Sequence, residues 1–151
     1  MAQEKAEYEV NEEFNVMAMR LVEKYPVKFD NIDVSKMCCV NITNKTRKEK
    51  EGSAERIWKL QSVKMPVAIH CQYSWYTVLY SQDWEDLSDK HKAALVADVL
   101  HGIPNEIDNE GGINPCDTKG YLSIFKTLGI DYLDDPDIPD LLDAEKDVEW
   151  K

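Results

Sequence analysis

The spacing of apolar residues changes along this chain, and those changes constrain its fold more than any other feature of the sequence. Apolar residues recur with helical periodicity in three segments and crowd into runs rich in aromatic and β-branched residues in two others. The segments are helical over 11–26, strand-like over 32–43 and 67–80, and helical again over 87–104 and 116–129. This order predicts an α+β domain in which a short, mostly antiparallel sheet packs against about three helices.

End signals support the three predicted helices. Asn11 is expected to cap the first helix and Pro26 to end it, while Ser88 caps the second before a stop at Gly102. Gly129 is expected to end the third. The residues expected to face the core are Phe14, Met17, Ala18, Leu21, Val22 and Tyr25 in the first helix, Leu87, Ala94, Leu95, Ala97 and Val99 in the second, and Tyr121, Ile124, Phe125 and Leu128 in the third.

The composition is that of a folded, acidic domain. The chain has 151 residues, of which 43% are hydrophobic, and this suffices for one domain with its own core. The net charge of −11 argues against general affinity for nucleic acid or anionic lipid, because both bind positive surfaces. No apolar run reaches the roughly 20 residues of a membrane span, and the charged N-terminus does not resemble a signal peptide. A cytoplasmic location is therefore expected.

Charge also suggests how the chain is divided. We expect a flexible arm at 1–10, a single domain at 11–134 and an acidic tail at 135–151. Nine acids and one lysine lie between 131 and 149, so this segment either lies against the domain through its leucines or hangs free. The stretch 44–59 is the basic exception, with six Lys or Arg and three Glu. We interpret it as a solvated connection or hairpin end rather than a nucleic-acid contact.

The four cysteines are expected to be reduced thiols. They are Cys38, Cys39, Cys71 and Cys116, and no Cys-x-x-Cys spacing occurs among them. The adjacent pair Cys38–Cys39 stands in the apolar run MCCVNI, which favours small, buried strand residues over a disulfide framework.

The stretch ALVADVLHGIP, residues 94–104, falls where a zinc-peptidase helix would carry His-Glu-x-x-His. In that motif two histidines one turn apart hold the metal, and the glutamate activates a metal-bound water. Here residues 97–101 read Ala-Asp-Val-Leu-His, so the last histidine is present and the first is absent. His91 lies nearly three turns before His101, about 15 Å away, and is expected at the surface.

Several segments, taken in order, resemble the family of putative phage metallopeptidase domains. They are EKYP followed by IDVS, a basic stretch with a Trp, an aromatic strand, DWEDLSDKHKAALVADVLH, and NPCDTKGYLSIFKTLGIDYL. The resemblance covers about residues 12–134. It implies a small zincin-like domain with His-Glu-Leu-Leu-His-Ile on a long helix. It also implies a Pro-His-Asp motif that opens the following helix, which ends Gly-hydrophobic-Asp-aromatic.

Carried over residue by residue, the resemblance places three zinc ligands and one catalytic carboxylate. The first ligand falls at Ala97, the second at His101 and the third at Cys116, which follows Pro115. An alanine methyl cannot bind metal, whereas a cysteine thiolate can. The catalytic glutamate falls at Asp98, which keeps the carboxylate on a side chain one methylene shorter.

Three interpretations stay open. In the first, the site is dead and the fold is kept for binding. In the second, Asp98, His101 and Cys116 form a rebuilt zinc site that is structural rather than catalytic, with His70 or Cys71 as a fourth ligand. In the third, the resemblance is accidental and His101 is a helix-end histidine that the negative helix terminus stabilises.

The preferred interpretation is a catalytically degenerate family member, a pseudoenzyme that binds a host protein and inhibits a host defence factor. Under it no cofactor is expected, and neither nucleic acid nor membrane is bound directly. One alternative is a zinc-dependent metallopeptidase or hydrolase with altered ligands. The other is an acidic inhibitor that mimics DNA, whose binding would weaken steeply with salt.

Overall fold

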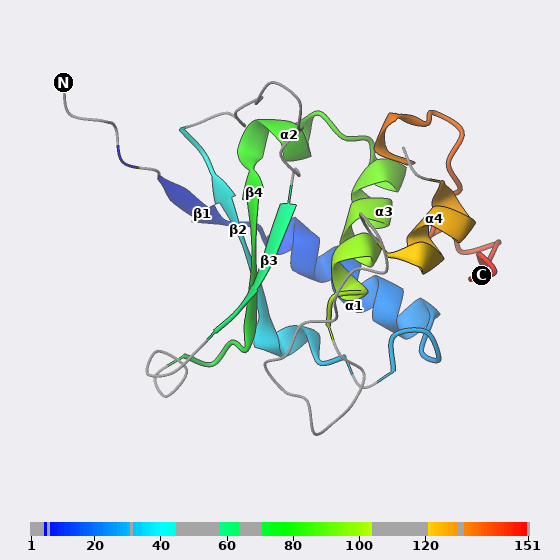
Figure 1. Ribbon diagram of the computed structural model, residues 1–151, viewed down its shortest axis with the longest axis horizontal. Coiled ribbons are helices and arrows are strands. Elements are labelled where there is room, and N and C mark those ends of the chain that lie inside the picture. Colours follow the sequence, from blue (N-terminus) through cyan, green and yellow to red (C-terminus); the bar gives the residue numbers. More distant parts are fainter. Residues whose placement is uncertain are drawn as a thin grey trace.

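The fold is taken from a computed structural model of the chain, shown in Figure 1. It confirms a small α+β domain, in which a mixed sheet packs against helices. The structure describes residue 5 and residues 7–30, 32–44, 58–63, 71–103, 121–129 and 132–150.

The described strands form a four-stranded sheet in the order β1-β2-β4-β3. Its central pair, β2 (Met37–Ile42) and β4 (Trp75–Tyr80), is parallel, with Met37 opposite Trp75. The two outer pairings, of β1 (Tyr8–Val10) with β2 and of β3 (Trp58–Ser62) with β4, are antiparallel. Two of the three pairings are antiparallel, which agrees with the expected mostly antiparallel sheet, and the central pairing is parallel.

Two helices cover one face of the sheet, as Figure 1 shows. In α1 (Glu12–Lys24), the Asn11 side chain accepts a hydrogen bond from the Phe14 backbone N–H at 3.0 Å, which confirms the expected cap. In α3 (Asp89–Leu100), Ser88 occupies the corresponding position. Helix α3 is more deeply buried than its amphipathic pattern predicts, because α1, the sheet and the C-terminal segment surround it. Its buried residues are Ala93, Ala94, Leu95, Val96, Ala97, Val99 and Leu100.

Three short elements complete the domain near the ends of α3. Helix α2 (Ser81–Glu85) connects β4 to α3, and η4 (Tyr132–Asp134) is a single 3-10 turn. Helix α4 (Leu122–Leu128) ends at Gly129, whose φ of 101° confirms the expected glycine stop. The expected start of this helix, before residue 121, lies outside the described residues. No helix in the described part of the chain is long and apolar enough to cross a membrane.

Parts of the sheet lie at other residues than the sequence predicts. Tyr8–Val10 form β1 within the segment 1–10 that was expected to be a flexible arm. Trp58 and Lys59, assigned to a polar connection, begin β3. The expected strand over 32–43 begins only at Met37, because a 3-10 turn, η1 (Val34–Lys36), precedes it.

The acidic C-terminal segment lies against the domain over its described residues. Leu141 is fully buried, and Leu133 and Leu142 are partly buried against the same core. Figure 1 shows this segment, in orange to red, beside α3 and α4.

Candidate functional site

The two candidate site residues of the second helix stand at the C-terminal end of α3. Asp98 lies in its last turn, and His101 is its C-terminal cap residue. Both side chains are partly buried, whereas Ala97 beside them is fully buried. Near its C-terminal end, α3 therefore carries a carboxylate at residue 98 and an imidazole at residue 101. Residue 97, where the resemblance expects the first zinc ligand, carries only a methyl group.

The Asp98 carboxylate is held by a tyrosine. Tyr132 Oη donates a hydrogen bond to Asp98 Oδ2 at 2.5 Å, and Tyr132 is itself buried at 5% exposure. A short hydrogen bond from a phenol to an ionisable oxygen belongs to the stronger class of such bonds. Tyr132 therefore fixes the orientation of Asp98 and links α3 to η4.

The His101 ring is oriented by its own helix. His101 Nδ1 lies 2.6 Å from the Ala97 carbonyl oxygen. A carbonyl oxygen can only accept, so Nδ1 must carry the hydrogen. In a neutral imidazole with this tautomer, the lone pair resides on Nε2. The same contact, from Nδ1–H to a backbone carbonyl, orients metal-binding histidines in other proteins.

Aromatic rings surround His101. The ring centroids of Phe29, Tyr121 and Trp150 lie 5.6, 5.8 and 5.3 Å from that of His101, and the Phe29 ring meets it edge to face. These rings come from the turn after α1, the start of α4 and the C-terminal segment. Three separate parts of the chain thus meet at one histidine.

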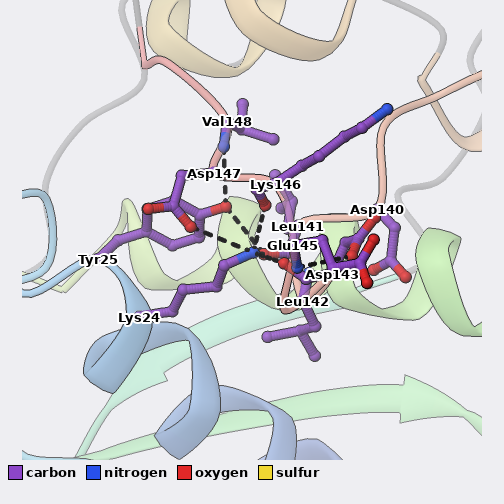
Figure 2. A network of polar contacts seen from close by, with 10 residues as sticks. All are labelled: Lys24, Tyr25, Asp140, Leu141, Leu142, Asp143, Glu145, Lys146, Asp147 and Val148. Carbon is purple, nitrogen blue, oxygen red and sulfur yellow. Dashed lines mark hydrogen bonds and ion pairs between the residues drawn. The ribbon is translucent and has the colours of Figure 1, made fainter.

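The C-terminal segment is fastened over this site by α1. Figure 2 shows Lys24 Nζ reaching the backbone carbonyls of Leu141, Asp143 and Lys146, at 2.9 Å for Leu141 and 2.7 Å for Lys146. Tyr25 Oη donates to the Leu141 carbonyl at 2.8 Å.

The fastened segment is residues 141–150, and we call it the C-terminal strap. Tyr25 Oη also accepts a hydrogen bond from the Val148 N–H at 3.1 Å. Lys28 Nζ lies 5.5 Å from the Trp150 ring centroid. These contacts hold the indole of Trp150 against His101.

Gly102 allows Tyr121 to pack closely against the end of α3. A Cβ atom at residue 102 would come within 2.9 Å of Tyr121 Oη and 2.5 Å of Leu60 Cδ2. Both distances are shorter than an ordinary van der Waals contact. The glycine is therefore needed for the packing at the end of α3.

The remaining predicted ligands are not joined to this site within the described residues. Cys116 and His70 lie outside those residues. Cys71 is half-buried just before β4, and His91 contacts Ser88 Oγ and the Asp135 carbonyl at the other end of α3. No group of three or more His, Cys, Asp or Glu in the described part of the chain is arranged to hold a metal ion.

The sequence matches the model of one protein family over most of its length. The model of the family described as "Putative phage metallopeptidase" matches residues 6–145. The chain belongs to the putative phage metallopeptidase family. No curated protein and no solved structure matched in the corresponding searches.

Zinc is the metal that a metallopeptidase of this kind would use, and the described residues fit it in part. His101 offers an Nε2 lone pair in the correct tautomer, and Asp98 offers a carboxylate that is already bound to Tyr132. Ala97 offers nothing. In this member of the putative phage metallopeptidase family, Cys116, which lies outside the described residues, is the third ligand that the resemblance indicates.

Sequence reasoning missed the residues that surround the two candidates. Tyr132 is the aromatic residue of the GIDYL segment, so its signal was present in the resemblance to the putative phage metallopeptidase family but carried no assigned role. Phe29 and Trp150 gave no usable signal, because they lie 72 and 49 residues from His101 in the sequence.

Proposed function

We propose that this chain is a catalytically silent member of its family that acts by binding a protein of the host cell. The observation that supports this most is the environment of Ala97, whose methyl group is fully buried where the resemblance expects the first zinc ligand. A methyl group has no lone pair to give to a metal. With two ligands in place of three, most of the affinity of roughly 10–16 kcal/mol for structural zinc would be lost.

The position of Asp98 supports the same proposal. A general base must reach the metal-bound water, and here one carboxylate oxygen accepts the Tyr132 hydroxyl at 2.5 Å. Asp98 also has a side chain one methylene shorter than that of the glutamate implied by the resemblance. Water activation would therefore be lost together with metal binding.

Metal content tests this proposal directly. The chain is purified without chelator, and its zinc is measured by elemental analysis beside the His101→Ala variant. We expect both proteins to contain far less than about one zinc per chain. A content near one in the wild type that falls in His101→Ala would reject the silent site. Because this readout needs no substrate, it is independent of any peptidase assay.

The binding part of the proposal rests on charge and on the family's description. A phage protein acts inside a bacterial host, and a net charge of −11 suits a partner with a basic surface, such as a nuclease or another defence component. Affinity capture from bacterial lysate at several salt concentrations tests it. Failure to retain any specific protein would count against binding, while a steep loss of the partner with salt would favour the DNA-mimic alternative.

The second candidate function is a zinc-dependent hydrolase with altered ligands. It is favoured by the His101 tautomer, since the Nδ1–H that faces the Ala97 carbonyl places the imidazole lone pair on Nε2, the nitrogen that would bind zinc. Asp98, His101 and Cys116 would then be the ligands, and because Asp98 would no longer serve as the general base, the zinc alone would have to activate the water. Its test is zinc content in Cys116→Ser and Asp98→Asn, each of which would lower bound zinc only under this alternative.

A further inference from the structure

A groove unrelated to the α3 site lies between α1 and the segment 32–35. It encloses about 530 Å³, within the range of about 300–1,000 Å³ found for small binding pockets. Its apolar wall is formed by Met19 and Val22 of α1 together with Ile32 and Val34. Ile32 and Val34 are buried at 7% and 8% exposure, so they form the floor.

The rim of the groove exposes apolar surface to solvent. Met19, which lines the groove, is 53% exposed, and Val16, about one turn earlier on α1 and not among the lining residues, is 56% exposed. Neither residue belongs to the apolar face of α1, which is Phe14, Met17, Ala18 and Leu21. Methionine side chains adapt readily to different apolar partners. The groove therefore offers a fixed floor and an adaptable edge.

The charged residues that line the groove are both acidic, and the other polar residues that line it are Asn15 and Ser35. Glu23 is exposed at one side and Asp33 at the other. A hydrogen bond from the Ser35 hydroxyl lowers the pKa of Asp33, and this carboxylate, like an ordinary aspartate, is ionised at neutral pH. Asn15 donates its amide hydrogen to the Met37 carbonyl at 2.9 Å, and no donor among the described residues reaches its buried Oδ1.

We propose that this groove binds a short segment of a partner protein that presents an aliphatic or aromatic side chain flanked by lysine or arginine. The apolar side chain would occupy the floor over Ile32 and Val34, and the basic residues would face Glu23 and Asp33. The chain's net charge of −11 favours approach of a basic segment, and Glu23 and Asp33 are the acidic residues that it would meet at the groove. This inference rests on the binding function proposed above and gives the chemistry of the partner.

A synthetic peptide tests the groove without knowledge of the partner. The probe is a short amphipathic peptide with leucine on one face and lysine on the other, and the matched control replaces the leucines by serine. Both are titrated into the full chain and followed by heteronuclear NMR. We expect saturable shifts for the leucine peptide at 15–23 and 32–35 and no saturable shifts for the serine peptide. Shifts centred elsewhere, or equal shifts for both peptides, overturn the proposal.

Two substitutions with matched controls locate the contact. Met19→Lys places a cation on the rim, and Glu23→Lys reverses one of its charges; each should weaken peptide binding about tenfold or more. The controls are Leu122→Lys on α4, where the leucine is 41% exposed, and Glu85→Lys at the exposed end of α2. Equal loss of binding in the controls would reject a specific groove.

The outcomes separate this inference from the proposed function. If a host protein is captured from lysate and Met19→Lys and Glu23→Lys leave the capture unchanged, the groove is wrong and the binding function stands. If the peptide binds as expected and no host protein is retained, the groove stands and the binding function fails. If Met19→Lys abolishes a concentration-dependent dimer of the free chain, the occupant is a second copy, and the proposed partner is wrong.

Discussion

Asp98 and Tyr132 lie 34 residues apart in the chain and meet through a hydrogen bond of 2.5 Å. This contact joins the last turn of α3 to the 3-10 turn that begins the C-terminal segment. The carboxylate that a family resemblance would make catalytic is thus also a structural partner of a buried tyrosine.

Removing the hydroxyl of Tyr132 should lower stability. Tyr132→Phe leaves the partly buried Asp98 without this donor, and we expect a loss of about 1–2 kcal/mol in the free energy of unfolding, measured with urea. Tyr8→Phe is the control, because Tyr8 is 62% exposed. In a double-mutant cycle with Asp98→Asn, the two effects should not add; additive effects would mean that the pair does not interact.

Lys24 should be needed to hold the C-terminal strap. Lys24→Met keeps the apolar stem but removes the donor to three carbonyls, and we expect a loss of about 1–3 kcal/mol and faster tryptic cleavage at Lys146. Lys59→Met, at an exposed position of β3, is the matched control. Unchanged cleavage in Lys24→Met would show that the strap is fastened by other contacts.

Gly102→Ala should destabilise the end of α3. The added methyl would lie 2.5 Å from Leu60 Cδ2 and 2.9 Å from Tyr121 Oη, and we expect a cost of about 1–3 kcal/mol in thermal or urea unfolding. Shortening the leucine by Leu60→Ala should recover part of the loss in the double variant relative to the sum of the single changes. A neutral Gly102→Ala would contradict the close approach.

Cys39 should make stability fall in alkaline solution. Burial raises the pKa of the Cys39 thiol, so the folded chain keeps its proton where the unfolded chain releases it. The unfolded state then binds fewer protons, and the stabilisation is complete below about pH 8.5 and is lost progressively as the pH rises above that value.

The measurement for Cys39 is urea unfolding between neutral and alkaline pH for the wild type and Cys39→Ala. The difference in stability between the two proteins should shrink as the pH rises. A constant difference would contradict the raised pKa. Native Cys39 should also resist alkylation, because it is fully buried as well as protonated.

Local signals predicted the helices well and the sheet edges poorly. Asn11 and Gly129 acted as caps as expected, because capping depends on the residue's own backbone and side chain. Strands β1 and β3 were missed, since three and five residues of modest alternation become strands only when they pair with β2 and β4. The parallel pairing of β2 with β4 was missed for the same reason.

The site was predicted in part. Asp98 and His101 were indicated by the resemblance to the family motif, and their spacing of three residues on one helix then places them close together. Their partners Tyr132, Phe29 and Trp150 come from distant parts of the chain. The roles assigned to Asp98, His101 and Cys116 as metal ligands stay predictions.

The sequence by itself determined the α+β class, the two long helices with their ends, the acidic charge and the family to which the chain belongs. Periodicity, capping and motif order can be determined in this way because each depends only on residues near one another in the chain or on their order along it. Tertiary structure decided the order of the strands, the tyrosine on Asp98, the rings around His101 and the strap held by Lys24. Each of these depends on which distant segments come into contact, and that choice is made by packing of the whole core rather than by any short stretch of residues.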